Sequence, residues 1–595
     1  MKRTLTALLA LAFVLPLAPA GTDAAHATVA DSSRAIVLRP HRVDLVHNGR
    51  VARKLWLPAG PASLSTLVDR INDARYASRD GDVVTLHAAL SQRPGSVLQV
   101  SAPLRALHLA DTGTGPVYLA GTGATVVFAD VAVASTTGTG TAPLSAHRPD
   151  IRYLNGSSVT TSHAVFTGLG SGPDRWGFVV ASGSTLDAQD TTFQNGLRGL
   201  DLPAAGAVRL TRVRATGNTS AGIVVNRTRD LRLDTVTASG NGGSGLVLRG
   251  PVPALALART ASTGNGADGV ELSAMGPAPV GPLTTEHNHA AGVVLRACLG
   301  CVLSHATSTS DGDGVAVQTG SAGAVVRGAS VTHANGRGIR VAAPGARVES
   351  FTVTSAAGGT GIQLARTATH ATVSAGTVTG GTYGIADNAT DTAVSGVTVT
   401  DAATGIRVGG HADRVTITKA TVDGADTGVT TTATVGSVTL IQLRTRQTGD
   451  YGVRSRARAL TVISSQISGA TVGLDLNRGT VNDSVVSGGA LAIAVSAAGR
   501  GDLNRDSIHA DVMAIRARPT GVAVLTDTTV GAPLGGRGII VCRGRTHFPA
   551  LPLSRLGLFA AIALAAAISL ELLRKVRERG GSAATTAPSH VTNTA

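Results

Sequence analysis

Five charged residues recur at nearly even intervals along the chain and could do chemistry together: Asp201, Arg227, Arg249, Glu271 and Arg296. An arginine holds a carboxylate through two parallel hydrogen bonds, and a nearby carboxyl group can take or give a proton. If these residues share a groove, Arg249, Glu271 and Arg296 would bind an acidic polysaccharide, whose uronate carboxylates the arginines would hold, and an acid or base beside them could move a C5 proton. The alternative is a solvated charged surface without a ligand.

A glycine opens each of a long series of short runs in which apolar residues alternate. In TGNTSAGIVV, for example, Gly222 is followed by Ile223 and Val225. Alternation with a period of two residues predicts a β-strand. These glycines lie 21 to 24 residues apart, at Gly177, Gly199, Gly222, Gly245, Gly269, Gly292, Gly314, Gly338, Gly361, Gly384, Gly405, Gly428, Gly452 and Gly473.

A repeat of this length carries about three short strands, which cannot bury their apolar faces alone. Stacked on its copies, each strand would pair in parallel with its counterpart at about 4.8 Å per coil. The sequence therefore predicts an all-β solenoid, a parallel β-helix. The second residue after each glycine would point outward, and this outward column reads Asp201, Val224, Val247, Glu271, Val294, Ala316, Arg340, Gln363, Ala386, Arg407, Thr430, Arg454 and Asp475.

An asparagine stands four residues before the glycine in five consecutive repeats. In stacked coils these carboxamides would lie one above another and form a hydrogen-bonded ladder. The glycine would allow a tight corner with a positive φ angle. After this stretch Ser310 takes the equivalent place, and the DGDG sequence at 311–314 reads as a turn rather than an ion site. The predicted ladder consists of Asn195, Asn218, Asn241, Asn265 and Asn288.

Both ends of the chain differ from the repeats. Lys2 and Arg3 precede an apolar stretch that ends in small residues, as in a secretory signal peptide. LGLFAAIALAAAISLELL, near the other end, is long and apolar enough for a transmembrane helix, and basic residues follow it on what would be the cytoplasmic side. A helix docked on the body is the alternative. Before the repeats, 64–71 has helical spacing, with Ser63 as its N-cap.

These signals divide the chain into five parts and predict a body outside the cell, attached to the cell membrane by a single pass. The helix with its flanking strands would cover the open edge of the first coil. The predicted parts are a signal peptide at 1–27, a small N-terminal α/β cap at 28–95, the β-helix at 96–545, a transmembrane helix at 556–573 and a cytoplasmic basic tail at 574–595.

Composition limits the partners and cofactors. The formal net charge of +15 favours a polyanion, although the scarcity of lysine among the basic residues could also reflect base composition. With only three cysteines the body is not built on disulfides, but Cys298 and Cys301 could close a local one in a turn. No nucleic-acid motif and no metal-binding spacing occurs. No cofactor is therefore predicted, with calcium left open at DGDG.

The coils resemble a known group of proteins. The GIVV, GLVL and GVEL segments with their Gly-Asn turns resemble the right-handed parallel β-helix family that includes pectate lyases, over about 97–544. This resemblance implies a right-handed coil. SHAVFTGLGSGPDRWGFVV, followed by GLRGLDLPAAG and AGIVVNR, is similar to the mannuronan C5-epimerase branch of carbohydrate-modifying enzymes over about 162–249.

In that branch an Asp-Pro-His-Asp motif follows a strand, and an arginine follows the next coil. Asp201 matches the first Asp of the motif and Arg227 matches the arginine, which implies catalytic roles for both. The place of the His holds Pro203, and the place of the second Asp holds Ala204. The resemblance thus implies a carbohydrate-directed role with an incomplete catalytic motif.

Two functions follow from these observations. The first is a membrane-anchored extracellular β-helix protein that binds or modifies an acidic polysaccharide; as an enzyme it would be a polysaccharide lyase or a uronate C5-epimerase. The second is a structural or adhesive surface solenoid without catalysis. The low aromatic content, 3%, and the absent motif His favour the second over an enzyme.

Overall fold

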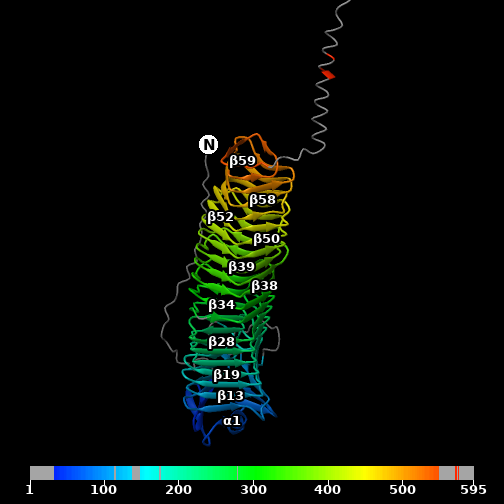
Figure 1. Ribbon diagram of the computed structural model, residues 1–595. Helices are drawn as coiled ribbons and strands as arrows, with labels where there is room; N and C mark the ends of the chain where they lie inside the picture. The colour runs from blue at the N-terminus through cyan, green and yellow to red at the C-terminus, as the bar shows by residue number, and fades with distance from the viewer. Residues whose placement is uncertain are drawn as a thin grey trace, which may run out of the picture. The chain divides into compact units, whose positions relative to one another are not determined.

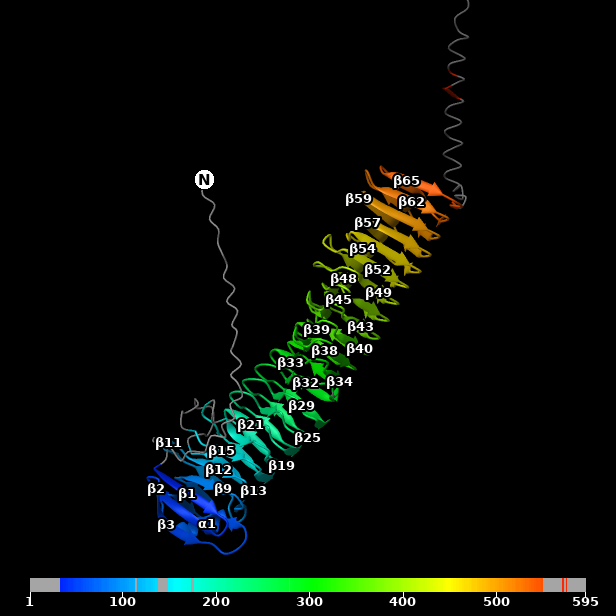
Figure 2. The same cartoon turned by 90° about the vertical axis from the view of Figure 1, so that its left-hand side faces the viewer.

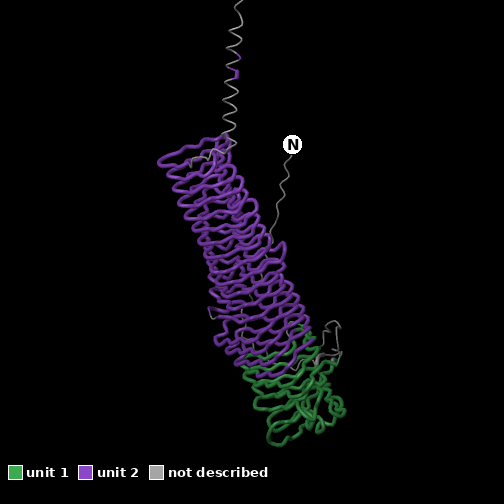
Figure 3. Tube along the Cα trace, turned by 45° about the vertical axis from the view of Figure 1, so that its right-hand side comes forward, with its two compact units in different colours: residues 1–186, 195–197 green, residues 187–194, 198–595 purple. Residues whose placement is uncertain are grey.

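The computed structural model describes residues 33–112, 115–136, 148–172, 176–277, 279–548, 570, 571 and 574 (Figure 1). They divide into two compact units: unit 1 comprises 1–186 and 195–197, and unit 2 comprises 187–194 and 198–595 (Figure 3). The predicted signal peptide lies outside the described residues, as do the predicted transmembrane helix and tail except for 570, 571 and 574. Within the described ranges, no helix is long and apolar enough to cross a bilayer.

Unit 1 begins with an antiparallel meander of β1 (Arg34–Arg39), β2 (Arg42–His47) and β3 (Arg50–Trp56), and β1 also pairs in parallel with β7 (Ala89–Gln92). The predicted helix is confirmed as α1 (Leu64–Ile71), which buries its apolar stripe. Ser63 occupies the N-cap position, but its hydroxyl lies 2.8 Å from that of Ser65 and makes no cap bond to a helix N–H group.

Most of the rest of unit 1 winds into coils whose strands pair in parallel on three faces. Two pairs are antiparallel instead: Ala77–Asp80 with Val83–Leu86, and Asp111–Thr112 with Gly115–Pro116. Three phenylalanines from successive coils, Phe128, Phe166 and Phe178, fill the interior edge to face, with ring centroids 4.6 to 6.2 Å apart. The strands are β4 (Ala62–Ser63), β5 (Ala77–Asp80), β6 (Val83–Leu86), β8 (Val97–Val100), β9 (Ala106–Leu109), β10 (Asp111–Thr112), β11 (Gly115–Pro116), β12 (Tyr118–Thr122), β13 (Thr125–Ala129), β14 (Ala132–Ser135), β15 (Asp150–Leu154), β16 (Ser158–Ser162), β17 (Val165–Thr167), β18 (Gly177–Val180) and β19 (Thr185–Gln189), the last divided between the units.

Unit 2 is a parallel β-helix, which confirms the predicted all-β solenoid (Figure 2). Each coil contributes one strand to each of three faces, in the order first, second, third. The first face consists of β21 (Arg198–Pro203), β24 (Ile223–Asn226), β27 (Leu246–Arg249), β30 (Val270–Ser273), β33 (Ala291–Arg296), β36 (Asp313–Val317), β39 (Arg337–Val341), β42 (Thr360–Leu364), β45 (Tyr383–Asp387), β48 (Thr404–Val408), β51 (Thr427–Thr431), β54 (Tyr451–Ser455), β61 (Met513–Ala517) and β64 (Leu534–Gly536), with the first halves of β57 (Val472–Asn482) and β59 (Leu491–Asn504).

The second face takes the second halves of β57 and β59, and the third face consists of shorter strands. The other second-face strands are β22 (Ala207–Thr211), β25 (Asp230–Asp234), β28 (Ala254–Ala258), β31 (Pro279–Val280), β34 (Val302–Ser304), β37 (Val325–Arg327), β40 (Arg347–Glu349), β43 (Thr372–Ser374), β46 (Ala393–Ser395), β49 (Val415–Thr418), β52 (Ser437–Ile441), β55 (Ala459–Ile463), β62 (Val522–Thr526) and β65 (Ile539–Arg543). The third-face strands are β20 (Thr192–Gln194), β23 (Arg214–Thr216), β26 (Thr237–Ser239), β29 (Thr260–Thr263), β32 (Leu283–Glu286), β35 (Ala306–Thr309), β38 (Ser330–Ala334), β41 (Thr352–Ser355), β44 (Thr377–Thr379), β47 (Thr398–Thr400), β50 (Thr421–Asp423), β53 (Arg444–Arg446), β56 (Gln466–Ile467), β58 (Val485–Gly488), β60 (Ser507–Ala510) and β63 (Thr529–Val530).

A buried column of carboxamides runs through the turns between the third and first faces of unit 2. Nδ2 of Asn218 donates to Oδ1 of Asn241 at 2.9 Å, and the same bond joins Asn241 to Asn265 at 2.9 Å and Asn265 to Asn288 at 2.8 Å. Each Oδ1 also accepts from the backbone N–H of the preceding asparagine at 3.0 to 3.1 Å. The column therefore ties four consecutive turns together through both side chain and backbone.

The ladder ends differently from the prediction. Asp311, not Ser310, accepts the last bonds, from the backbone N and Nδ2 of Asn288 at 2.7 and 2.9 Å, and the hydroxyls of Thr285 and Ser308 also donate to it. Asn195 also differs: it is itself the left-handed residue of its turn, with φ of 53°, and its carbonyl accepts from Arg148. In the later turns Gly217, Gly240 and Gly264 hold the left-handed place, one residue before the ladder asparagine.

The glycines that open the first-face strands serve a purpose other than the one predicted. Gly199, Gly222, Gly245 and Gly269 do not adopt positive φ angles. Instead, a Cβ atom added to any of them would lie 2.7 to 2.9 Å from Nδ2 of the asparagine in the next turn. Glycine is needed because the ladder carboxamide and the backbone of the next coil, including the carbonyl oxygen of its own first-face glycine, fill the space that a side chain would occupy.

The CLGC sequence closes a local disulfide between Cys298 and Cys301 in the turn that joins β33 to β34. Cys542 is free and exposed. The disulfide thus stabilises a single turn, and the solenoid itself is stabilised by strand pairing and by its apolar interior.

Candidate functional site

The first face of unit 2 carries two outward columns of side chains. The predicted column, two residues after each glycine, is in register, since Asp201 pairs with Val224, Val224 with Val247 and Val247 with Glu271. A second column, which the sequence reading missed, consists of the residue before each glycine. Where both columns are apolar they bury each other, as in the cluster of Ala221, Val224 and Val247.

Charged residues replace the apolar ones in particular coils and form what we call the charged strip. Its members come from both outward columns and from the ends of the first-face strands. The strip consists of Arg198, Asp201, Arg249, Asp268, Glu271 and Arg296.

Asp201 lies at the start of the strip and is only 5% exposed. Its Oδ2 atom is 3.3 Å from Nη1 of Arg198, the residue before Gly199. Burial raises the pKa of the Asp201 carboxyl, and the positive charges of Arg198 and Arg249 offset only part of that rise. Burial also lowers the pKa of Arg198. Asp201 is therefore a buried carboxyl group that holds its proton more tightly than an exposed aspartate.

Arg296 connects both outward columns. Its Nη2 atom is 3.1 Å from Oδ2 of Asp268, and its Nε atom is 3.8 Å from Oε1 of Glu271. Oε1 of Glu271 also lies 3.3 Å from Nη2 of Arg249. The two carboxylates are buried, whereas the arginine side chains are 46% and 50% exposed. The arrangement fixes two cationic groups at the surface by anchoring them to carboxylates beneath.

Asp268 also accepts a hydrogen bond from the backbone N–H of Ala291 at 3.1 Å. Burial raises the pKa of its carboxyl; the Ala291 bond and Arg296 oppose the rise, and the negative charge of Glu271 adds to it. Asp268 borders an open hollow of about 520 Å³. Its polar lining includes Arg296, Asp313, Gln318, Asn335 and Arg340.

The predicted catalytic pair does not come together. Arg227 takes a left-handed conformation, with φ of 54°, just after β24, and its side chain is exposed. Within the described ranges no hydrogen bond or ion pair joins it to Asp201, whose partner is Arg198. Its backbone N–H donates to the carbonyl of Arg249. The structure does bring together the three predicted binding residues, Arg249, Glu271 and Arg296.

Arg198 and Asp268 were missed because strict alternation places the residue before the glycine inside. A signal was present, however. The places before Gly199, Gly269, Gly314 and Gly338 hold charged residues, and a charged side chain is rarely buried in an apolar interior.

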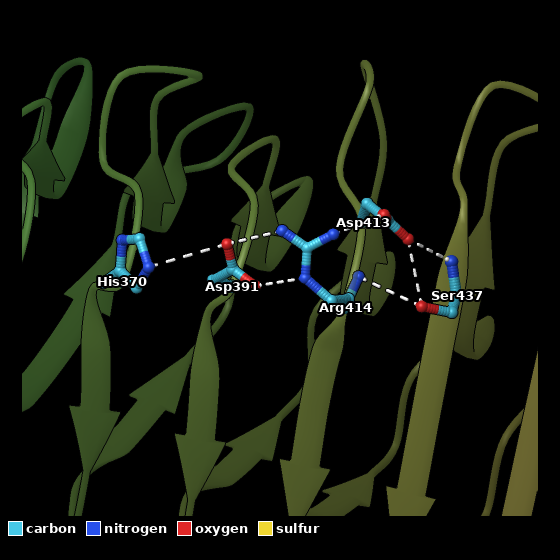
Figure 4. A network of polar contacts seen from close by, with 5 residues as sticks. All are labelled: His370, Asp391, Asp413, Arg414 and Ser437. Carbon is cyan, nitrogen blue, oxygen red and sulfur yellow. Dashed lines mark hydrogen bonds and ion pairs between the residues drawn. The ribbon is translucent and has the colours of Figure 1, made fainter.

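A different charged column occupies the turns between the first and second faces (Figure 4). Arg414 binds Asp391 through Nε and Nη2, and Nε2 of His370 is 3.6 Å from Oδ2 of Asp391. Oδ1 of Asp413 accepts from the backbone N and the hydroxyl of Ser437 at 2.8 and 3.0 Å. The hydrogen bonds and charge of Arg414 lower the pKa of Asp391. Arg414 lies off the first face and so supplies a control arginine.

Metal binding has no support from the clustering of side chains. Among the described residues, no group of three or more His, Cys, Asp or Glu side chains could hold a metal ion. Asp311 and Asp313 of the DGDG sequence are engaged instead by the ladder and by Arg337, whose backbone N–H donates to Asp313 at 2.9 Å.

No protein-family profile and no curated protein sequence matches this chain. Among solved structures, a single-residue variant of the periplasmic alginate epimerase AlgG is 13% identical with a TM-score of 0.38, covering 64% of this chain and 82% of that one. The tailspike protein of E. coli bacteriophage HK620 in complex with a pentasaccharide is 10% identical with a TM-score of 0.28, covering 65% and 72%. The A-module of the Azotobacter vinelandii mannuronan C-5 epimerase AlgE6 is 14% identical with a TM-score of 0.22, covering 78% and 91%. These likenesses concern the β-helix fold alone.

Proposed function

We propose that the protein binds an acidic polysaccharide along the charged strip. The observation that carries this proposal is that Arg296 bridges Asp268 and Glu271, and that Arg249 also pairs with Glu271. An arginine that is already oriented loses little conformational freedom when it binds a ligand carboxylate. The neighbouring carboxylates can accept hydrogen bonds from sugar hydroxyls.

This mixture of charges favours a sugar polymer over a nucleic acid. Asp268, Glu271 and Asp313 would repel a continuous phosphate backbone, whereas a uronate polymer offers both carboxylates for the arginines and hydroxyls for the acids.

The test is a titration of the full chain with a polyuronate and, in parallel, with a neutral polysaccharide at low and high salt. We expect binding to the polyuronate alone, weakened by salt through screening. Arg249→Ala and Arg296→Ala should each weaken it by about tenfold, which corresponds to about 1.4 kcal/mol. Arg414→Ala is the control, since it removes one positive charge from the network in Figure 4. If all three variants lost the same affinity, the effect would come from net charge alone, and the proposed binding along the charged strip would be refuted.

A catalytic activity is the second candidate, and the buried Asp201 carboxyl favours it. With its raised pKa it is suited to take a proton from C5 of a uronate. Return of a proton to the opposite side would invert C5, whereas loss of the C4 substituent would give an unsaturated end. NMR of a polyuronate after incubation distinguishes these products. If neither product forms, the protein is a non-catalytic binding or adhesive solenoid.

We also propose that the body faces the outside of the cell and is attached to the membrane by the segment 556–573. The support is the sequence pattern of a signal peptide at one end and an apolar stretch followed by basic residues at the other. Fractionation and protease treatment of intact cells test this: the chain should stay with membranes, and added protease should remove the β-helix. Recovery in the cytoplasmic fraction would refute the proposal.

A further inference from the structure

Farther along the first face of unit 2, two arginines lie over tyrosine rings. The guanidinium carbon of Arg407 in β48 is 5.3 Å from the ring centroid of Tyr383 in β45, and that of Arg454 is 4.9 Å from the ring of Tyr451, both in β54. Figure 2 shows β45, β48 and β54 along the same face. Both rings lie within the range of a cation–π interaction.

Both pairs belong to the two outward columns of the first face, the same columns that supply residues to the charged strip. The tyrosines precede Gly384 and Gly452, and the arginines follow Gly405 and Gly452 by two residues. The strand register runs from Tyr383 through Thr404 and Thr427 to Tyr451. Three coils at about 4.8 Å each separate the tyrosines by about 14 Å, and two coils separate the arginines by about 10 Å.

The arginines here are little neutralised. Arg407 makes one hydrogen bond, from Nη1 to Oδ1 of Asn388 at 3.3 Å, and no ion pair in the described part of the chain. Arg454 lies 4.0 Å from Asp475, but Nη2 of Arg456 holds that carboxylate at 2.6 Å. In the described part of the chain, Arg340 also has no ion pair. On this part of the first face, Arg407 and Arg340 thus have no acidic partner among the described residues, and Arg454 shares its only one, Asp475, with Arg456.

A glycine makes room for one of these groups. A Cβ atom on Gly409 would lie 2.7 Å from Nη1 of Arg407. The guanidinium group therefore lies close to the backbone of the following turn and to the ring of Tyr383. These contacts restrict its position, while its other N–H groups can bind an anion with two hydrogen bonds.

We infer that the Tyr–Arg pairs form a second anion-binding segment, which grips the same linear acidic polysaccharide farther along its chain. The inference rests on the proposed function. A polymer that runs along the stack from Arg249 to Arg454 crosses nine coils, or about 43 Å. The hollow that Asp268 and Arg296 of the charged strip share with Arg340 extends from the strip toward the Tyr–Arg pairs. The ligand group at the Tyr–Arg pairs is a carboxylate or a sulfate of the polymer.

The experiment is calorimetric titration of the full chain with polyuronate oligomers of increasing length. Affinity should rise with length until the oligomer reaches both segments and then level off. Arg407→Ala and Arg454→Ala should leave the affinity for short oligomers unchanged. Each should lower the affinity for long oligomers about fivefold, and the double variant should lower it on the order of 20-fold. Sulfated oligomers of matched length show which anion the segment prefers.

Further variants separate oriented binding from plain charge. Tyr451→Phe keeps the ring and should bind like the parent, whereas Tyr451→Leu and Arg454→Lys should lose part of the affinity for long oligomers. Gly409→Ala should act like the loss of Arg407. Binding that does not depend on length, or losses equal for short and long oligomers, would overturn this inference and leave the proposed function intact. Failure to bind oligomers of any length would overturn both.

Discussion

The ladder asparagine Asn241 is the most informative residue to change. Its carboxamide, 1% exposed, makes four hydrogen bonds. Nδ2 donates to Oδ1 of Asn265 at 2.9 Å and to the carbonyl of Ala215 at 3.1 Å. Oδ1 accepts from Nδ2 of Asn218 at 2.9 Å and from its backbone N at 3.1 Å. Asn241→Ala removes all four bonds without adding bulk.

The cost follows from which partners can be satisfied elsewhere. Nδ2 of Asn218 still reaches the carbonyl of Phe193 at 3.3 Å, and Oδ1 of Asn265 still accepts from the backbone N of residue 241 at 3.0 Å. The buried backbone N–H of Asn218 loses its bond to Asn241. An unsatisfied buried donor costs about 2 kcal/mol and each further lost bond about 0.5 to 1 kcal/mol. With one such donor and three further lost bonds, we expect the free energy of unfolding to fall by about 3.5 to 5 kcal/mol.

Urea denaturation measures the loss, and native-state hydrogen exchange locates it, because a solenoid can open coil by coil. Exchange should accelerate most at the backbone amide of Asn218. Asn335→Ala is the matched control, because Asn335 is exposed and its Nδ2 atom makes a single bond of 3.3 Å to the carbonyl of Ser310. If the two variants differ by less than about 1 kcal/mol, the ladder does not hold the turns as argued.

Three more predictions concern single residues. Gly269→Ala should destabilise the fold, because the new methyl group would lie 2.6 Å from the carbonyl oxygen of Gly292 and 2.7 Å from Nδ2 of Asn288. Thermal melts compared with Gly489→Ala check this, since Gly489 has no positive φ and its new methyl group would meet nothing nearer than 3.8 Å. Burial raises the pKa of Asp506 from 3.8 to about 7, so its contribution to stability is full below pH 3.8 and is lost, on the order of 4 kcal/mol, as pH rises to about 7. Asp506→Asn should reduce the change of Tm with pH in that window. Arg198→Gln should raise the pKa of Asp201 further, as measured by a ¹³C NMR titration of its carboxyl.

The coil architecture could be predicted because the spacing of the glycines is constrained by the stack itself. A coil that changed its length at a strand would lose its register with both neighbours, so 21 to 24 residues recur between first-face glycines. Alternation after the glycine then correctly identified the column of Asp201 and Glu271. The same alternation failed on the other side of the glycine, where the turn places Arg198 and Asp268 outward.

Counting back from the glycine failed where a turn changes length. From Asn288 to Asp311 is 23 residues, whereas from Gly292 to Gly314 is only 22, so the ladder position moves by one and Ser310 was chosen in place of Asp311. Arg227 failed for another reason. It stands three residues beyond Val224, which pairs with Asp201, and its left-handed backbone turns the chain away from the first face. The same left-handed turn recurs at Ala204, Gly250, Ala274 and Ala297, but different residue types occupy it, so the sequence carries no signal for it.

The ladder and the charged strip occupy the same coils for a physical reason. Because the first-face glycine has no side chain, the asparagine of the next coil can approach it. This asparagine holds the turn between the third and first faces, and the last residue of that turn, just before the next glycine, belongs to the second outward column. Asp268 is such a residue: it stands three places after Asn265, so the bonds of Asn265 also determine where the carboxylate meets Arg296. In the described residues beyond Asp311, no asparagine supports the turns in this way, and cation–π contacts with Tyr383 and Tyr451 help to position the arginines instead. The two stretches of the first face thus reach the same result, cationic groups held in fixed orientations, by different means.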